Sequence, residues 1–247
     1  MLTEQRQEMI LQMLEEKGSI TVGEIREKFD SSESTIRRDL NYLDSIGKLT
    51  KVFGGAVLRE NRFITKELSV SQKSLVNIEA KTRVAQYAAQ LIEADDFVYI
   101  DAGTTTECMI SYITERNATY VTNAVAHAKI LANAGFKVIL VGGELKGTTE
   151  AVVGVQAVVT IQGYHFSKGF FGTNGISIKS GYTTPDYSEA LVKKTALHNC
   201  QKCYILADNT KFGETSSVTF ADIGDAEIIT DGVPSEHYRS LNNIITV

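Results

Sequence analysis

Polar residues follow three apolar runs in the middle of the chain, at the points where strands are predicted to end. DAGTTT at 101–106 follows FVYI, Thr122 and Asn123 close a second run, and a third leads into GGELK at 142–146. Ligands of open parallel sheets bind beyond the carboxyl ends of the strands. Gly103 allows close approach of the backbone, and the following threonines add hydroxyl donors to the free N–H groups of a helix start. A phosphate group suits this geometry, although Thr and Gly are also ordinary capping residues. The candidate ligand-binding residues at these strand ends are Asp101, Gly103, Thr104, Thr105, Thr106, Thr122, Asn123, Gly142, Gly143 and Lys146.

The N-terminal part of the chain carries residues suited to nucleic acid. Residues 1–33 hold four Lys or Arg against eight Asp or Glu, whereas residues 34–59 hold five against two. Positive charge is therefore local in a chain whose formal net charge is −5, and a local basic surface binds the phosphates of DNA. The alternative is a small helical cap whose arginines are merely solvated. The candidate DNA-binding residues are Ser32, Ser34, Thr35, Arg37, Arg38, Asn41, Lys48 and Lys51.

Three amphipathic helical patterns position these N-terminal residues. The second pattern starts at Thr21 with Glu24 three residues later, which is a capping-box arrangement. The third starts after Ser32, whose residue type predicts an N-cap, and places an apolar stripe from Ile36 to Ile46 on one side and the arginines on the others. KLTKVFGGAVLR then indicates two short strands around Gly54 and Gly55, a pair that can supply the positive φ values of a hairpin turn. The pattern predicts a winged helix-turn-helix over residues 1–57 with a DNA-recognition helix.

The rest of the chain predicts an α/β domain. Residues 58–77 lack Gly and Pro and are mostly polar, so they are expected to form a linker. From residue 78 to 247, apolar runs such as FVYID, TYVTN, KVILVGG, KGFFGT, CYILAD, EIIT and NIITV alternate with helical patterns, one of which spans 152–159 and another 186–199. This alternation predicts a mostly parallel sheet with helices on both faces.

Composition excludes several classes of protein. The 247 residues are 43% hydrophobic and 22% charged, which is typical of folded domains rather than disordered chains. No apolar run is long enough for a membrane span and the N-terminus has no signal-peptide pattern, so a cytoplasmic protein without a membrane partner is expected. Three cysteines are too few for a disulfide framework, and neither CxxC at 200–203 nor the histidines have zinc-site spacing. We therefore expect neither a metal nor a cofactor.

The segment SESTIRRDLNYLDSIGKLTKVFGGA, residues 32–56, resembles the N-terminal signature of the DeoR family of bacterial transcriptional repressors. Phe53 departs from the family pattern, in which His often precedes the two glycines. The resemblance therefore does not assign the contact that the wing makes with phosphate or with the minor groove. DAGTTT, VTN, GGELK and LADNTKFG resemble the sensor domain of the same family, which binds phosphorylated sugars or related metabolites. Together the two similarities cover most of the chain.

The sensor region is also similar to ribose-5-phosphate isomerase and the CoA-transferase-like fold, which leaves an enzyme as the alternative function. FGTNGIS resembles the isomerase segment Asp-Gly-Ala-Asp-Glu, but Phe171 and Asn174 stand where its two aspartates would. In EALVKK, Lys193 or Lys194 falls near the position of the general-base glutamate. An ammonium group cannot abstract a proton at neutral pH without a large fall in its pKa. Glu189 is expected to bind sugar hydroxyls or to pair with Lys193, and LADNTK keeps Lys211 as a cation for the substrate.

The resemblance implies a repressor that binds double-stranded operator DNA of a carbohydrate operon and is released by a phosphorylated sugar. Fructose 1-phosphate is the first candidate, with tagatose phosphates as rivals. A dimer or tetramer is expected, because one small module reads few base pairs whereas two modules read two half-sites. To the strand-end residues above, the resemblance adds four further candidates for effector binding: Asn174, Glu189, Lys193 and Lys211.

Overall fold

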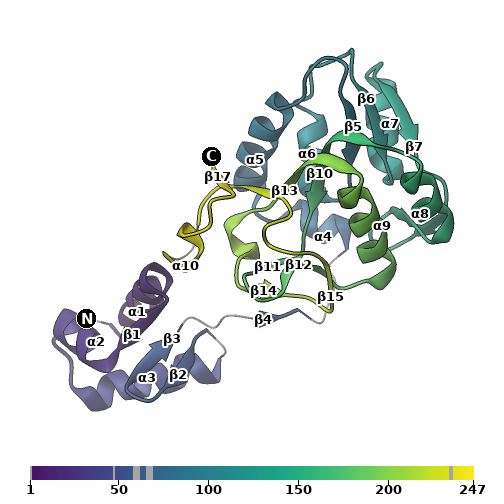
Figure 1. Ribbon diagram of the computed structural model, residues 1–247. Coiled ribbons are helices and arrows are strands. Elements are labelled where there is room, and N and C mark those ends of the chain that lie inside the picture. Colours follow the sequence, from purple (N-terminus) through teal and green to yellow (C-terminus); the bar gives the residue numbers. More distant parts are fainter. Residues whose placement is uncertain (1, 47, 58–61, 65–68, 234–235) are drawn as a thin grey trace. The chain divides into compact units, whose positions relative to one another are not determined.

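The computed structural model describes residues 2–46, 48–57, 62–64, 69–233 and 236–247 (Figure 1). The chain forms two compact units. The first comprises Met1–Arg62 with Val233–Asn242, and the second comprises Phe63–Gly232 with Asn243–Val247. The predicted linker at 58–77 therefore lies only partly within the described residues.

The first unit is a winged helix-turn-helix, as the sequence predicted. Its helices are α1 (Thr3–Lys17), α2 (Val22–Phe29) and α3 (Glu33–Ser45), and the short helix α10 (Glu236–Arg239) comes from the C-terminal segment. Strands β1 (Ser19–Thr21), β2 (Thr50–Val52) and β3 (Gly55–Val57) form an antiparallel sheet in the order β1-β3-β2.

Local hydrogen bonds fix the two helix starts that the sequence predicted. The Thr21 hydroxyl accepts from the Glu24 backbone N–H at 3.2 Å, and the Glu24 carboxylate accepts from the Thr21 N–H at 2.8 Å. The Ser32 hydroxyl accepts from the Thr35 N–H at 3.3 Å. These bonds satisfy N–H groups that have no partner inside a helix, so α2 and α3 each start at a defined residue. The stripe of α3 packs in the core of this unit through Ile36, Leu40 and Leu43, whereas its predicted last residue, Ile46, follows the helix and is 49% exposed.

The two glycines of the wing have different roles. Gly54 has a φ of 83°, which L side chains rarely adopt, as the predicted hairpin turn requires. Gly55 does not have a positive φ, so the sequence prediction was wrong for this residue. A Cβ at Gly55 would instead lie 2.1 Å from the Ile20 carbonyl oxygen, and Gly55 is thus needed for the close pairing of β3 with β1.

A buried ion pair joins α1 to α3. The Arg6 guanidinium donates to the Asp39 carboxylate from Nε at 2.6 Å and from a terminal nitrogen at 3.3 Å, and the Gln7 amide donates to the same carboxylate at 3.2 Å. Arg6 and Asp39 are 8% and 3% exposed. Asp39 raises the pKa of Arg6 through this hydrogen bond. Asp39, which lies within the RRDL segment, thus holds α3 against α1.

We expect Asp39→Asn to destabilise the N-terminal unit by about 2 kcal/mol, because it removes the charge from a buried hydrogen-bonded pair but keeps the shape. Urea unfolding followed by far-UV circular dichroism would measure the change. Asp44→Asn, at an exposed carboxylate on the same helix, is the matched control. Equal stability of the two variants would contradict the proposed role of Asp39.

The second unit contains a seven-stranded sheet in the order β17-β16-β13-β10-β5-β6-β7, and all its pairings are parallel. The predicted apolar runs form these strands, which are β5 (Phe97–Ile100), β6 (Thr119–Thr122), β7 (Lys137–Leu140), β10 (Phe166–Gly172), β13 (Cys200–Leu206), β16 (Glu227–Thr230) and β17 (Ile244–Thr246). The main helices are α5 (Ile78–Gln90), α6 (Thr104–Ile110), α7 (Val125–Asn133), α8 (Val155–Gln162) and α9 (Tyr187–His198).

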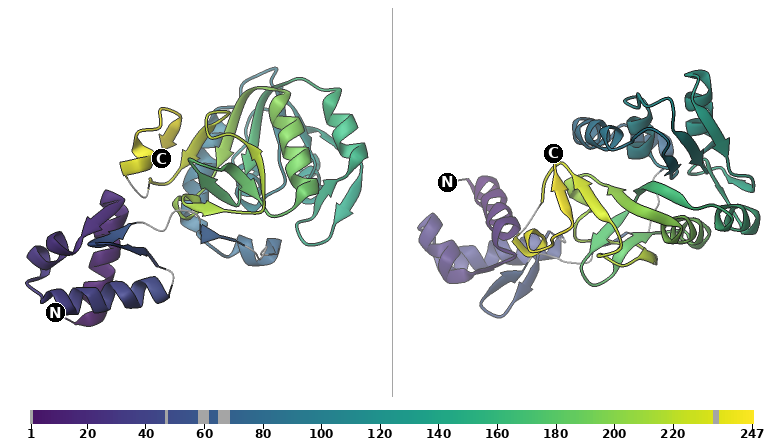
Figure 2. Two further views of the ribbon diagram at one scale, coloured as in Figure 1. Left: turned by 60° about the horizontal axis from the view of Figure 1, so that its bottom comes forward. Right: turned by 45° about the horizontal axis from the view of Figure 1, so that its top comes forward.

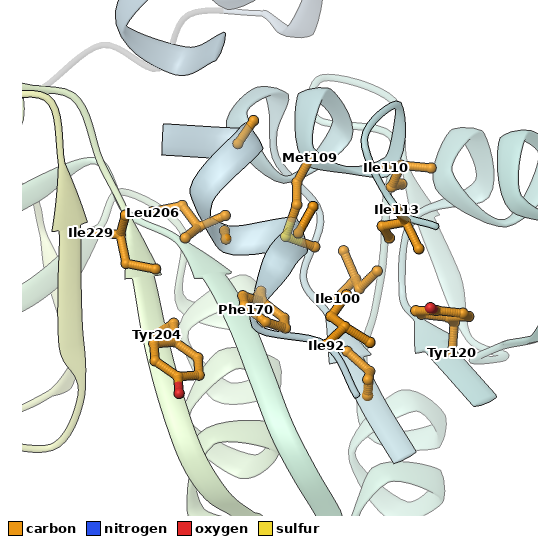
Figure 3. Packing of buried hydrophobic residues seen from close by; sticks show 14 of the residues in the cluster. Ile92, Ile100, Met109, Ile110, Ile113, Tyr120, Phe170, Tyr204, Leu206 and Ile229 are labelled. Carbon is orange, nitrogen blue, oxygen red and sulfur yellow. The ribbon is translucent and has the colours of Figure 1, made fainter. Parts of the chain in front are cut away.

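Helices cover both faces of this sheet (Figure 2). The larger core lies on the side of α5, α6 and α7, where Met109 and Ile110 of α6 belong to one buried cluster with strand residues such as Phe170 and Tyr204 (Figure 3). The rings of Phe170 and Tyr204 stack with centroids 5.2 Å apart. Helix α9 packs against β10 and β13. Burial on both faces explains why these strands have continuous apolar sequences.

The structure adds elements that the sequence analysis did not predict. Short strands form a second sheet, β11-β12-β15, comprising Gly175–Ser177, Gly181–Thr184 and Val218–Ala221. Residues 151–153 form strand β9, paired with β8 (Glu144–Lys146), so the helix expected from residue 152 begins only at Val155. Within the expected linker, β4 (Arg62–Phe63) pairs with β14 (Glu214–Thr215) and α4 (Val70–Ser74) forms a capped helix. The described part of this segment therefore packs on the second unit.

Candidate functional site

The predicted DNA-binding residues form an exposed surface on α3 and the wing. Arg37 pairs with Glu33 one turn earlier, with its Nε 2.8 Å from the carboxylate, and both side chains are about half exposed. The Lys51 ammonium donates to the Asn41 side-chain oxygen at 2.6 Å, which links the wing to the helix. Arg38 and Lys48 are exposed. Ser32, Ser34 and Thr35 instead form a hydroxyl cluster at the helix start, with Ser32 2.9 Å from Ser34 and 2.8 Å from Thr35.

This arrangement separates two kinds of contact. We expect Arg38→Ala to weaken binding to a specific operator by roughly 10- to 100-fold and to relax its sequence preference, because an exposed arginine on a recognition helix can read a guanine edge.

Lys51→Ala should weaken binding equally on all DNA sequences. It should also reduce the slope of log affinity against log salt concentration by about the amount expected for one lost phosphate contact. Gel shifts at several salt concentrations, with operator and random DNA, would distinguish these effects. Unchanged affinity in both Arg37→Ala and Arg38→Ala would contradict the assignment of α3 as the recognition helix.

A polar pocket lies at the carboxyl ends of β5, β10 and β13 in the second unit. Its floor comes from Ala102 and Gly103 after β5, from Gly172 to Asn174 at the end of β10, and from Leu206 at the end of β13 with Asp208 just beyond it. Helices and two loops contribute the rest of the lining, with Val76 following α4 and Thr149 lying between β8 and β9. These residues are Val70, Lys73, Val76, Lys81, Thr104, Thr105, Thr149, Glu189, Lys193 and Lys211. The pocket therefore occupies the sheet edge predicted from the polar strand ends.

Asp101 and Lys193 form a buried ion pair behind this pocket. The Lys193 ammonium donates to the Asp101 carboxylate and, at 3.1 Å, to the Gly172 carbonyl. The Gly172 N–H donates to the same carboxylate at 3.0 Å. Asp101 is 1% exposed, and burial raises its pKa, although Lys193 opposes that shift. The pair fixes β5, β10 and α9 with respect to one another and leaves Lys193 at the pocket wall.

Lysines give the pocket its positive charge. Lys73, Lys81, Lys193 and Lys211 all line it. Burial lowers the pKa of Lys81, Asp208 opposes the shift, and neighbouring Lys211 lowers the pKa further. Asp208 is itself held by the Asn77 amide at 3.0 Å and by the Thr210 N–H at 3.1 Å. An anion bound among these ammonium groups would relieve their repulsion.

Glu189 faces the pocket but is already held by neighbouring side chains. Its carboxylate accepts from the Lys146 ammonium at 3.0 Å and from the Thr149 hydroxyl. Lys193 pairs with Asp101, so the expected pairing of Glu189 with Lys193 was wrong. Asn174 lines the pocket, and its side-chain oxygen accepts from Thr184 at 3.3 Å.

Other predicted residues lie behind the pocket wall and support it. The Thr106 hydroxyl donates to the carbonyls of Asp101 and Gly103 at 2.7 and 2.8 Å, so it fixes the turn instead of facing a ligand. The Asn123 amide oxygen accepts from the Ala102 N–H at 3.0 Å, and its nitrogen donates to the Val152 carbonyl at 3.1 Å. Thr122 accepts from the Ala124 N–H at 3.1 Å. Three further candidates are absent from the described pocket lining, namely Gly142, Gly143 and Lys146.

The sequence analysis missed Lys73, Lys81, Thr149 and Asp208. Lys73 belongs to the segment expected to be a linker, and Lys81 looks like an ordinary polar residue of an amphipathic helix. Asp208 stood within LADNTK, beside the Lys211 that was selected. Its position directly after a strand could have identified it.

Neither metal binding nor membrane insertion is indicated by the described residues. None of their His, Cys, Asp and Glu side chains gather in groups of three or more that could hold a metal ion. Cys200 and Cys203 are half-buried, and their thiols donate to the carbonyls of Ala196 and Leu197. No described helix is sufficiently long and apolar to cross a bilayer.

Comparison with protein families assigns both units. Residues 6–62 match the model of the DeoR-like helix-turn-helix domain, and residues 76–232 match that of the DeoR C-terminal sensor domain. The chain belongs to the DeoR family. One DeoR-family relative, described as "Uncharacterized HTH-type transcriptional regulator FruR" of Bacillus subtilis, is 41% identical over 93% of this chain and 91% of its own length. The lactose phosphotransferase system repressor of Streptococcus mutans is 34% identical over 98% of this chain and 97% of its own.

Among solved structures, ribose 5-phosphate isomerase A from Neisseria gonorrhoeae matches with a TM-score of 0.40 and 13% identity, over 53% of this chain and 52% of its own. In the DeoR-family chain, Phe171 is fully buried and packs on Tyr99 with ring centroids 5.5 Å apart. Lys193 lies in the pocket wall, whereas Lys194 is exposed. Of the two lysines in the EALVKK segment, Lys193 is therefore the one in the pocket wall, beside Glu189 of the same segment.

Proposed function

We propose that this DeoR-family protein is a transcriptional repressor of a carbohydrate uptake or catabolism operon, and that a phosphorylated sugar in the sensor pocket releases it from operator DNA. The observation that carries the effector assignment is that four lysines line the same pocket as the helix start formed by Gly103, Thr104 and Thr105. Ammonium groups and free backbone N–H groups are the usual ligands of phosphate in proteins. The names of the two relatives agree with a role in sugar metabolism.

Fructose 1-phosphate is our first candidate for the effector, and tagatose phosphates are the alternatives. The phosphate would lie near Lys81 and Lys211, which line the same pocket as Thr104. The sugar hydroxyls would face Asn174 and Glu189, whose side-chain oxygens accept hydrogen bonds. In this assignment Thr106 and Asn123 position the backbone that meets the ligand.

The repressor would respond through linkage between its two ligands. If the effector prefers one arrangement of an oligomer and the operator another, each ligand weakens the binding of the other by the same factor. A coupling of about 1–3 kcal/mol would change operator affinity by roughly 5- to 150-fold. A dimer or tetramer in the cytoplasm supplies the two recognition helices that a pair of half-sites requires.

An isomerase is the alternative function, and the arrangement of carboxylates disfavours it. Proton abstraction needs a carboxylate base free to reach the substrate. Asp101 is buried against Lys193, Glu189 accepts from Lys146, and Asp208 accepts from Asn77. Each of these groups already serves as a hydrogen-bond acceptor within the protein. We therefore propose a pocket that binds without turnover.

Gel shifts with the promoter of the gene that encodes this protein, combined with thermal melting of the protein, would test the proposal. Fructose 1-phosphate, tagatose 6-phosphate and glucose 6-phosphate would each be titrated, because a ligand that prefers the folded state raises the melting temperature with concentration. We expect one ester to stabilise the protein and to release the promoter fragment. If no ester did either, the effector assignment would fail, and turnover abolished by Glu189→Gln would establish the isomerase instead.

A further inference from the structure

Helix α8 carries no charged residue, although part of its surface is exposed. Residues 151–167, which contain all of α8, include no Asp, Glu, Lys or Arg in a chain that is 22% charged. Val155 and Val159 lie one helical turn apart and are 77% and 56% exposed. Single exposed apolar residues are common, but a surface helix that exposes two in a row and has no charge is typical of an interaction surface.

The neighbouring helix α9 also exposes apolar residues. The two helices pack against each other (Figure 1). Tyr187 and Leu191 of α9 are one turn apart and are 70% and 37% exposed. Leu191 lines the same surface hollow as Gln162, the last residue of α8. We call these exposed side chains on the two helices the α8–α9 face, which comprises Val155, Val159, Tyr187 and Leu191.

The neutrality of α8 favours a second copy of this chain as the partner of the α8–α9 face. In an interface with twofold symmetry, each residue near the axis faces the same residue of the other copy, so a charge there would meet a like charge. Two copies of an uncharged helix can pack without this repulsion. DNA does not suit this helix, because α8 has no Lys or Arg to bind phosphates.

The charges near the two ends of α8 are complementary under the same symmetry. Exposed Glu144 lies at the helix start, with its Cβ 3.9 Å from the position that a Cβ of Gly154 would occupy. Exposed Lys194 lines a surface hollow together with Gln162 at the helix end. When two α8 helices pack antiparallel about a twofold axis, the start of each lies beside the end of the other. Glu144 of each copy then meets Lys194 of the other, and such pairs at the rim of an interface fix its orientation more than they add to its strength.

We propose that the α8–α9 face joins two copies of this chain in a twofold interface, with α8 packed antiparallel on its counterpart and Glu144–Lys194 ion pairs at the rim. The proposal rests on the function proposed above, which needs two recognition helices, and it names the surface that brings two chains together.

Helix α9 connects this interface to the effector pocket. Glu189 and Lys193 of α9 line the pocket, whereas Leu191 and Lys194 are exposed. One helix thus contacts the effector through some residues and the second copy through others. A shift of α9 on effector binding would change how the two copies pack, which is the differential interaction that linkage between effector and operator requires.

Sedimentation velocity of the full chain over a concentration series would test the interface. Val159→Glu places two like charges near the axis and should halve the sedimenting mass, from dimer to monomer or from tetramer to dimer. Far-UV circular dichroism would verify the fold of this variant, since an exposed position tolerates the change. Leu75→Glu, at a leucine that follows α4 and is 77% exposed, is the control and should leave the mass unchanged.

A charge exchange tests the antiparallel orientation. Glu144→Lys and Lys194→Glu should each weaken self-association by about fivefold or more, because each variant places like charges together across the interface. The double variant reverses the pair and should associate within about twofold of wild type. If Glu144 only stabilised the start of its own helix, the second substitution would not restore association.

The outcomes separate this interface from the proposed function. If the wild-type protein is an oligomer and Val159→Glu keeps its mass, or if Leu75→Glu halves the mass instead, the α8–α9 face is not the interface and the proposed function stands. A wild-type protein that stays monomeric over the whole concentration series would also overturn the proposal. A promoter fragment that responds to no sugar phosphate would defeat the proposed function and leave the interface intact.

Discussion

Replacing Lys81 or Lys211 with methionine is expected to weaken binding of a sugar phosphate by about 30-fold or more, since each change removes a charged hydrogen-bond donor from a partly desolvated site. Both lysines line the pocket, and Lys81 is only 7% exposed. The winged helix is unaltered in these variants, so operator affinity without effector should stay within about twofold of wild type. The variants would thus repress permanently in the presence of sugar.

The pH dependence of effector binding provides a second check on the same cluster. Burial and the neighbouring Lys211 lower the pKa of Lys81 in the unliganded protein. A bound phosphate would raise that pKa, because the ammonium form gains an anionic partner. Protons are therefore taken up on binding, and affinity should fall as the pH rises through the lowered pKa of free Lys81. In Lys81→Met this contribution should be lost.

Lys179→Met serves as the control for both measurements, because Lys179 is exposed and does not line the pocket. Titration calorimetry in two buffers of different ionisation enthalpy would detect the proton uptake. Normal effector release in both pocket variants would contradict the assignment of the phosphate to the lysine cluster.

The sequence was most informative where local chemistry determines the structure. The Thr21–Glu24 capping box and the Ser32 cap are short-range hydrogen bonds, and the stripe of α3 follows directly from helical spacing. The strands of the main sheet are buried on both faces, so their apolar runs mark them clearly. The rule that ligands bind at the carboxyl ends of parallel strands also predicted the position of the polar pocket at the Gly103 turn.

The remaining features depend on contacts between distant segments. Thr106 and Asn123 have the residue types of ligand-binding groups, yet their hydrogen bonds go to backbone atoms of the turn and, for Asn123, also of β9. Lys81 reaches the pocket because α5 packs beside Asp208, 127 positions later in the chain. The short antiparallel strands are set by tertiary pairing, and their few residues have no periodicity that a sequence pattern could detect.

Breaking the Asp101–Lys193 ion pair is expected to have the largest effect on the free energy of unfolding. Lys193→Met would leave a carboxylate that is 1% exposed with the Gly172 N–H as its hydrogen-bond donor among the described groups. Removing one partner of a buried ion pair typically costs about 3–5 kcal/mol. We expect a loss of that size in urea unfolding near neutral pH. Lys194→Met, on the exposed face of the same helix, should change the free energy of unfolding by less than about 0.5 kcal/mol.

The sign of the pH dependence distinguishes this mechanism from a simple packing defect. Burial already raises the pKa of Asp101 in the wild-type protein, and loss of Lys193 raises it further. A carboxyl whose pKa is higher in the folded state contributes stability that is present at low pH and is lost as the pH rises through that folded-state pKa. The deficit of Lys193→Met should therefore be greatest above the raised folded-state pKa of Asp101 and shrink as the pH falls below it. Adding Asp101→Asn to Lys193→Met should restore much of the stability and remove the pH dependence. If the loss of stability were instead independent of pH in both the single and the double variant, lost packing and not an uncompensated charge would explain the effect.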